Sequence, residues 1–148
     1  MRKGRDDDVA LDPSMYEGLA RFRLALRRFL AFSEAVTRAS GVTPSQYQAM
    51  LAIQAQPGGA IAIQDLAAQM LLQHHGAVQL VDRLARAELA ERRPSPTDRR
   101  RVLVVLTAKG RGLLERLALA HIAELLQHEP LLAESLRRLR AIGPIAAR

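Results

Sequence analysis

The 148-residue chain contains no cysteine, and its only lysines are Lys3 and Lys109. The absence of cysteine excludes disulfides, thiolate zinc sites and cysteine-based redox sensing. No apolar run approaches the roughly 20 residues that a membrane-spanning helix needs. The N-terminal sequence MRKGRDDD has no apolar segment after its basic residues, so it does not resemble a signal peptide. We therefore expect a cytoplasmic protein with no membrane partner.

Catalytic signatures are missing as well. The sequence has no glycine-rich phosphate loop, no nucleophile motif and no carboxylate pair in an evident cleft. Ser95 and Thr97 lie in a turn-rich segment without a neighbouring general base. We predict that the chain is not an enzyme and that it needs no cofactor.

Positive charge, in contrast, is abundant and comes almost entirely from arginine. The formal net charge is +7 and the sequence pI is about 11.1. A surplus of this size favours a polyanionic partner such as nucleic acid. With 49% hydrophobic residues, a chain of this length should form one globular domain.

Apolar periodicity predicts a mainly helical fold. Residues 1–12 are charged and aperiodic, so we expect a flexible arm there. Apolar side chains recur at three- and four-residue steps over 13–40, which predicts one long amphipathic helix. The TPSQ sequence at 43–46 predicts a capping box, and the helix that it opens should stop at 57–59 (PGG). Residues 60–63 form a candidate edge strand.

Two short helices follow, over 64–71 and 74–87, and the tight turn between them gives a helix-turn-helix arrangement. Strand signals at 89–93 and 101–106 flank the turn-rich tip PSPTDRR and predict a β-hairpin, or wing. The predicted inner face of the second short helix consists of Val78, Val81, Leu84 and Ala85.

Two more helices are expected at the C-terminal end. Thr107 should cap the first of them, which is predicted to end before Pro130. The second should stop at Gly143 and Pro144. The predicted fold class is thus mainly α, with a winged helix-turn-helix over 44–106.

The wing and the helix after it carry the most specific motif. Residues 98–100 read Asp-x-Arg, and after five residues 106–110 read Leu-Thr-x-x-Gly. Upstream, DLA at 65–67 and VQLVDRL at 78–84 stand at matching distances. On these motifs the chain resembles the MarR family of bacterial winged helix-turn-helix transcriptional regulators. The resemblance is motif-specific from 65 to 110 and extends in layout from Leu19 to Ile142.

This resemblance implies a homodimer that binds double-stranded DNA. The helices over 13–40 and 108–143 would form the dimerisation region of a single MarR-like domain, 13–143. Two winged helices would meet successive major grooves of a pseudo-palindromic operator, about 10 bp or 34–36 Å apart. Most members of the family are repressors released by a small, often phenolic ligand, and some are activators.

The arginine-rich tip and the exposed side of the second short helix are the predicted DNA-binding surface. Arg100 is expected to enter a minor groove narrowed by A·T-rich sequence, and the other arginines to lie on phosphates. Asp98 is expected to brace the hairpin, and Asp82, next to Arg83, to form an internal salt bridge. A solvated charged loop is the alternative explanation of the arginines. The full predicted set is His74, His75, Gly76, Ala77, Gln79, Arg83, Arg92, Arg93, Arg99, Arg100 and Arg101.

The chain departs from the family pattern at two places. Glu88 stands where the family usually has glycine after the recognition helix. If that position is still left-handed, glutamate costs roughly 1–2 kcal/mol over glycine; otherwise the end of the helix is reshaped. Gly76 and Ala77 replace the hydroxyl residues common at the start of that helix. Contacts made there by hydroxyls in relatives must come from backbone N–H groups, His74, His75 or Gln79.

Metal and effector sites have weaker support. His74 and His75 are adjacent on a helix and point in different directions, and His121 and His128 have no cysteine partner, so no metal site is predicted. DNA contact explains the first pair and ordinary packing the second. The candidate effector is a small aromatic or anionic molecule. Its predicted site is Phe22, Tyr47 and Met50 with Arg21 or Arg23 as anion partner, although core packing explains the three apolar residues equally well.

Two other functions stay open at this point. A non-specific architectural DNA binder would show little preference between operator and random duplex. A winged-helix protein-interaction module would bind an acidic protein through the basic face. The departures from the family pattern at Glu88 and Gly76 are compatible with that alternative.

Overall fold

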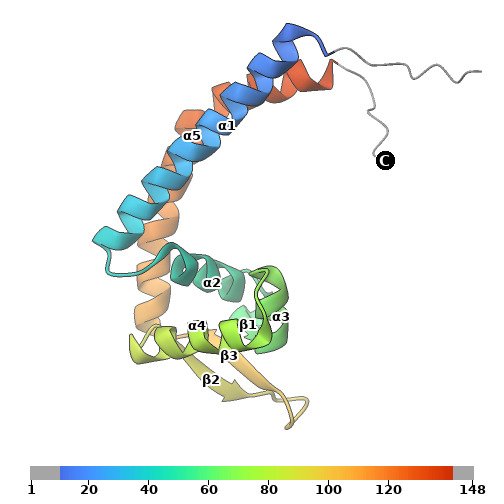
Figure 1. The fold of residues 1–148 in the computed structure, drawn as a ribbon. Helices are drawn as coiled ribbons and strands as arrows, with labels where there is room; N and C mark the ends of the chain where they lie inside the picture. The colour runs from blue at the N-terminus through green and yellow to red at the C-terminus, as the bar shows by residue number, and fades with distance from the viewer. Residues whose placement is uncertain (1–10, 142–148) are drawn as a thin grey trace, which may run out of the picture. The chain divides into compact units, whose positions relative to one another are not determined.

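The computed structural model describes residues 11–141, which divide into two compact units (Figure 1). The helix-pair unit comprises residues 11–31 and 124–141, and the winged-helix unit comprises Phe32–Ala123. Two helices, α1 (Pro13–Ala39) and α5 (Ala108–Arg140), contribute to both units. Apart from Leu11 and Asp12, the predicted arm lies outside the described residues, as does the predicted stop at 143–144.

In the helix-pair unit, small residues let the two helices approach closely. An ideal Cβ on Gly18 of α1 would lie 3.5 Å from the carbonyl oxygen of Ser135 and 3.5 Å from Cβ of Arg138, both on α5. The buried Ser135 hydroxyl is satisfied within its own helix, because it donates to the carbonyl oxygen of Leu131 at 2.8 Å. The start of α1 is capped by Asp12, whose Oδ1 accepts a hydrogen bond from the Ser14 N–H at 2.7 Å.

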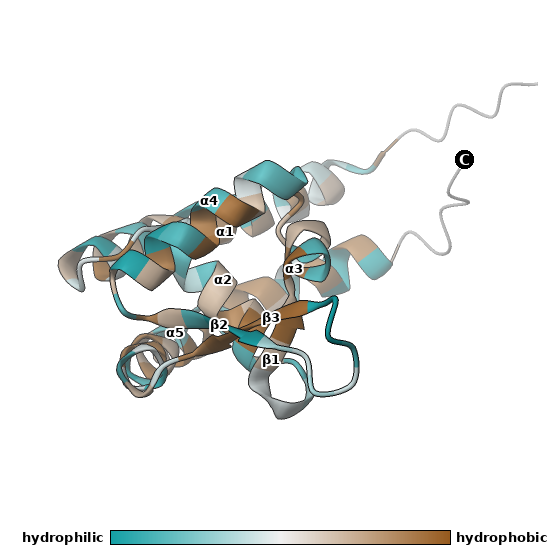
Figure 2. Cartoon of the chain, turned by 90° about the horizontal axis from the view of Figure 1, so that it is seen from below, coloured by the Kyte–Doolittle hydropathy of each residue, from teal (hydrophilic) through white to brown (hydrophobic). Residues whose placement is uncertain are grey.

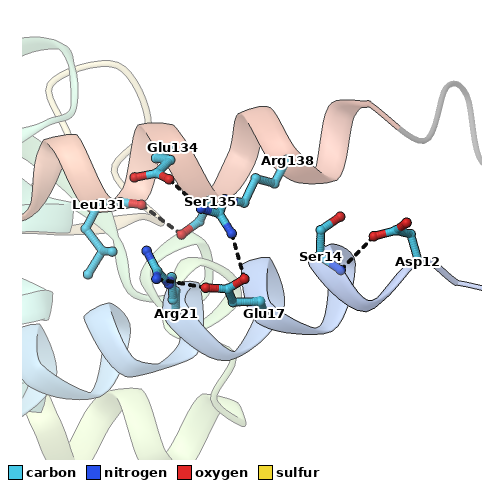
Figure 3. A network of polar contacts seen from close by, with 8 residues as sticks. All are labelled: Asp12, Ser14, Glu17, Arg21, Leu131, Glu134, Ser135 and Arg138. Carbon is cyan, nitrogen blue, oxygen red and sulfur yellow. Dashed lines mark hydrogen bonds and ion pairs between the residues drawn. The ribbon is translucent and has the colours of Figure 1, made fainter.

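Ion pairs join the same two helices across their exposed edge. Arg138 of α5 lies between two carboxylates, Glu17 of α1 at 2.9 Å and Glu134 at 2.7 Å, and Arg21 contacts Glu17 at 2.8 Å (Figure 3). The hydrogen bond and positive charge of Arg138 lower the pKa of the Glu134 carboxyl. A polar network thus reinforces a small apolar contact.

The C-terminal prediction of two helices is wrong, because α5 continues through Pro130 to Arg140. A proline inside a helix removes one N–H donor and crowds the carbonyl four residues earlier, here that of Leu126. The residues after Pro130 are strong helix formers (LLAESLRRLR), and Ser135 and Arg138 hold them against α1. These contacts offset the local cost of the proline.

The winged-helix unit follows the predicted order of elements. After the end of α1 come α2 (Pro44–Gln54), a 3₁₀ turn (Pro57–Gly59), β1 (Ala60–Ala62), α3 (Ile63–Gln69), α4 (His74–Arg86), β2 (Ala90–Pro94), β3 (Val102–Leu106) and the start of α5. The three strands form an antiparallel sheet in the order β1-β3-β2, with Ala60 opposite Val105 and Ala90 opposite Leu106. The predicted edge strand at 60–63 and the wing hairpin are therefore both confirmed.

The predicted capping box at the start of α2 is also confirmed. The Thr43 hydroxyl accepts from the Gln46 N–H at 3.2 Å, and the Gln46 side chain accepts from the Thr43 N–H at 2.8 Å. The helix that it opens buries Tyr47, Ala49, Met50 and Ile53. Helices α2, α3 and α4 pack with the sheet around one core, whose largest fully buried apolar residues are Met50, Ile53, Leu66, Leu84, Leu106, Val81 and Val104.

The inner face of α4 differs from the prediction at two of its four residues. Ala77, Leu80, Val81 and Leu84 are buried, whereas Val78 and Ala85 are only half-buried. The spacing of the buried set is that of one helical face. The small side chain of Ala77 was expected to face outward, but it lets α4 pack closely on the core.

Residues 106–110, the Leu-Thr-x-x-Gly motif, form a tight joint between α4, β3 and α5. The Thr107 hydroxyl donates to the Glu88 carbonyl oxygen at 2.6 Å and accepts from the Gly110 N–H at 3.0 Å. Its backbone N–H donates to the Leu89 carbonyl oxygen at 3.0 Å. An ideal Cβ on Gly110 would lie only 2.0 Å from that same Leu89 oxygen, so only glycine fits.

Candidate nucleic-acid interface

Helix α4 presents a polar outer side opposite its buried face. His74, His75, Gln79 and Arg83 are all exposed, and Gly76 is half-buried. Ala77 is 0% exposed, so its predicted place on the outer surface is wrong, and its side chain belongs to the core. Arg86, which the sequence analysis did not select, extends the exposed basic side by one turn. Its position three residues after Arg83 was the available signal.

Both ends of α4 are flanked by a non-glycine residue with positive φ. Leu71, with φ of 53°, precedes the helix, and Glu88, with φ of 59°, follows it. Of the two alternatives left open for Glu88, the structure shows the left-handed one. The N-cap residue Gln73 makes no side-chain capping bond, so the first turn depends on its packing.

The tip of the wing is ordered by short-range hydrogen bonds. The Ser95 hydroxyl accepts from the Asp98 N–H at 3.2 Å, and Asp98 Oδ1 accepts from the Arg100 N–H at 3.0 Å. The strands close around these bonds, because the Ser95 N–H donates to the Arg101 carbonyl oxygen at 2.9 Å. Ser95 is 8% exposed, and its hydroxyl group holds the turn together from the inside. A serine in a proline-rich turn is the signal that indicates such a role.

The wing combines an apolar inner strand with a hydrophilic tip. Figure 2 shows this change in hydropathy from β3 to the connecting loop. Arg99 and Arg100 are exposed at the tip, and neither makes an ion pair with any residue between 11 and 141. Among the five wing arginines, these are the two without a carboxylate partner in the described residues.

The other three wing arginines are paired with carboxylates. Arg92 contacts Asp82 of α4 at 2.6 Å, and Arg101 contacts Asp65 of α3 at 3.1 Å. The Nε of Arg93 lies 2.7 Å from Glu91 on the same strand. Asp82 therefore forms the expected internal salt bridge, but with Arg92 of β2 and not with its neighbour Arg83. Asp65, a residue of the DLA motif, was not predicted to contact the wing.

The predicted effector residues are distributed over both units. Arg21 and Phe22 lie in the helix-pair unit, and Arg21 is paired with Glu17. Tyr47 and Met50 lie in the core of the winged-helix unit, where burial raises the pKa of the Tyr47 phenol. A hollow of about 460 Å³ in the winged-helix unit was not predicted; it is lined by Leu51, Gln54 and Ala55 of α2 and by Arg111, Leu114, Glu115 and Ala118 of α5.

His121 connects three helices of the winged-helix unit. Its ring stacks on Tyr47 of α2, with centroids 4.2 Å apart. Its Nε2 lies 2.8 Å from the Ser33 hydroxyl of α1, and its Nδ1 donates to the Leu117 carbonyl oxygen at 2.7 Å. In the helix-pair unit, His128 lies 2.9 Å from Glu124. Both histidines thus take part in packing or pairing within their own unit.

Between residues 11 and 141, no three His, Cys, Asp or Glu side chains come together as a metal-binding group. None of the helices there is long and apolar enough to span a membrane.

The geometry of α3, α4 and the wing can be compared with known proteins. Residues 40–101, which include the helix-turn-helix and the wing tip, match the family model described as MarR family. Over these residues the chain is similar to the MarR family.

Solved structures share this fold over most of the chain. AbsC, a MarR family transcriptional regulator from Streptomyces coelicolor, is 24% identical, with a TM-score of 0.71 over 93% of this chain and 95% of its own. RV1404 from Mycobacterium tuberculosis is 25% identical, with a TM-score of 0.68 over 93% and 100%. Sco3205, a MarR family regulator from S. coelicolor solved in complex with DNA, is 19% identical, with a TM-score of 0.65 over 96% of both chains. No curated protein matches the sequence.

The chain therefore has the MarR-type winged-helix fold, mainly helical with a three-stranded antiparallel sheet. In this fold α4 occupies the position of the recognition helix, and the β2–β3 hairpin is the wing. The family's Leu-Thr-x-x-Gly motif is explained by the joint at Thr107 and Gly110.

Proposed function

We propose that the chain is a homodimeric, DNA-binding transcriptional regulator. Helix α4 would enter the major groove of each half-site, and the wing would reach the adjacent minor groove. The observation that carries this proposal is the exposed polar side of α4 next to a wing tip with two unpaired arginines, Arg99 and Arg100. Gln79 suits an adenine edge, and Arg83 a guanine edge or a phosphate.

Dimerisation is supported by large apolar side chains exposed along both long helices. In the helix-pair unit these side chains are Tyr16, Leu19, Leu26, Leu30, Leu125, Leu126 and Leu136, and in the winged-helix unit α5 exposes Leu119 and Ile122. Exposed apolar surface on this scale is typical of a protein interface. A second copy of the chain would cover it with a two-fold interface, as a palindromic operator requires.

The regulator is proposed to act in the cytoplasm as a repressor released by a small aromatic or anionic effector, with no catalytic activity. The hollow between α2 and α5 has a volume within the range of small-molecule sites, about 300–1,000 Å³. Arg111 on its rim supplies a positive charge for an anionic effector. Binding there would be reciprocally coupled to DNA binding by about 1–3 kcal/mol.

The experiment that tests this function is duplex binding across a salt series. The purified protein is titrated with DNA from its own upstream region and with random duplex of equal length. A sequence-specific regulator should prefer its operator by about 10³-fold or more and lose affinity steeply with salt. Equal affinities would instead support an architectural DNA binder. Absence of binding at low salt would support a protein-interaction module.

A further inference from the structure

The five wing arginines differ in what surrounds their guanidinium groups. Arg92 and Arg101 reach out of the hairpin to carboxylates on two different helices, Asp82 of α4 and Asp65 of α3. Arg93 pairs with Glu91 on its own strand. Arg99 and Arg100 have no carboxylate partner anywhere in the described part of the chain.

Paired arginines bring no net charge to a DNA phosphate. Binding to DNA depends on salt because each phosphate that is neutralised releases condensed counterions. An arginine that stays with its aspartate is already neutralised. If it moved to a phosphate instead, the aspartate would be left unpaired beside a polyanion, and the repulsion would cancel the gain.

The two long-range pairs also have a geometry suited to positioning. Asp82 fixes the β2 strand to α4 at Arg92, and Asp65 fixes the residue just before β3 to α3 at Arg101. These two ion pairs, called the anchors below, thus lie on either side of the Arg99–Arg100 tip, and each holds one strand of the hairpin. All four side chains are substantially exposed, with fractions from 35% to 57%, so these pairs contribute little to global stability.

We propose that Asp65 and Asp82 are positioning residues of the wing. They hold Arg101 and Arg92 away from the phosphates and fix the hairpin to the helix-turn-helix. The wing's electrostatic contacts with DNA then come from Arg99 and Arg100 alone. This inference rests on the proposed function, since it assigns roles within the same DNA-binding surface.

The test compares salt slopes on random duplex for a single arginine variant and for double variants that keep the net charge. Arg100→Gln removes one phosphate or groove contact, so the slope of log K against log[salt] should become shallower by about 0.9. Between about 50 and 200 mM salt this corresponds to a 3- to 4-fold smaller loss of affinity. The double variant Asp65→Asn/Arg101→Gln keeps the net charge and should leave the slope unchanged. Asp82→Asn/Arg92→Gln should behave in the same way.

Variants that replace only the aspartate of a pair test whether the freed arginine can reach a phosphate. Asp65→Asn frees Arg101, so binding to random duplex should tighten, and its salt slope should steepen by up to about 0.9. The preference for operator over random duplex should fall, because the added contact is independent of sequence. The proposal is overturned if Asp65→Asn/Arg101→Gln flattens the slope as much as Arg100→Gln does, since Arg101 would then lie on a phosphate.

A measurement without DNA tests the anchors themselves. The Arg101 N–H donates to the Asp98 carbonyl oxygen, so its exchange with solvent reports the order of the tip. Asp65→Asn, Arg101→Gln and the double variant should each accelerate this exchange by a similar factor, because each breaks the same pair. Unchanged exchange would overturn the positioning role even if DNA binds. If the variants accelerate exchange of the Arg101 N–H as expected but the parent protein binds no duplex, the proposed function is overturned and the positioning role is not.

Discussion

The two compact units are stabilised by different kinds of interaction. The winged-helix unit has a core of fully buried residues around Met50, Leu66 and Leu84, and joints such as the one at Gly110 where backbone atoms almost touch. The helix-pair unit buries little more than small side chains, such as those of Ala25 and Ser135, and adds exposed ion pairs around Arg138.

This difference concerns how much of its own apolar surface each unit buries. Burial of apolar area is the main stabilising contribution in folding, whereas exposed ion pairs contribute about 0–1 kcal/mol each. The winged-helix unit has its own core and should tolerate surface changes well. The helix-pair unit leaves Leu19, Leu30 and Leu126 exposed, and it gains most if a second copy covers them.

The largest predicted effect is at the Gly110 joint. Gly110→Ala places a Cβ against the Leu89 carbonyl oxygen, and the backbone must move, so we expect a loss of about 3 kcal/mol in unfolding free energy. Urea denaturation measures it. Gly112→Ala on the same helix is the control, because its Cβ would meet only the Arg116 side chain at 3.8 Å. If both variants are equally stable, the tight joint is not a feature of the protein.

The next effect concerns the Thr107 hydroxyl. Thr107→Val keeps the side-chain shape but removes the bonds to the Glu88 carbonyl and the Gly110 N–H, so we expect destabilisation of about 2 kcal/mol. Thermal unfolding followed by circular dichroism is the measurement. Thr97→Val, at the exposed wing tip, should shift the midpoint much less. A small effect at Thr107 would mean that neither the residue after α4 nor the first turn of α5 depends on the Thr107 hydroxyl.

The two left-handed residues that flank α4 should respond unequally to glycine. Leu71→Gly relieves strain at a side chain that is 93% exposed, so we expect a gain of about 1 kcal/mol. Glu88→Gly relieves similar strain but loses the contact of Glu88 with Lys109, so its gain should be smaller. Chemical denaturation of both variants ranks them. Leu71→Ala is the control and should give no gain, because alanine is strained at the same φ.

The sequence predicts most of the fold because local signals agree with the tertiary contacts. The capping box at Thr43 and the wing follow from residue types with one dominant local preference. Glutamate has no such preference for a left-handed conformation, so the sequence left the conformation of Glu88 open. The break that the sequence predicts at Pro130 does not occur, since contacts between distant residues outweigh a local penalty. The burial of Ala77 was missed because alanine is too small to mark one face of a helix.

The candidate site was less predictable than the fold. Residue type and spacing select a basic tip, but they do not show which arginines are already paired. Asp65 and Arg101 are 36 residues apart, and their contact depends on how the wing returns to α3. The exposed sides of α4 and the tip therefore follow from the sequence, whereas the division between paired and unpaired arginines needs the structure.

The smallest predicted effect is a pH dependence of the helix-pair unit. Arg138 lowers the pKa of Glu134, so the stabilisation is fully present above the unfolded value, about 4.3, and is lost as pH falls through the lower folded value. Unfolding midpoints between about pH 6 and 3 should therefore fall less in Glu134→Gln than in the parent. Glu129→Gln on the same helix is the control, since Glu129 makes no ion pair with the residues that the structure describes. An identical acid response in Glu134→Gln and the parent would show that exposed charges add nothing here, and that the apolar faces of α1 and α5 alone determine the stability of this unit.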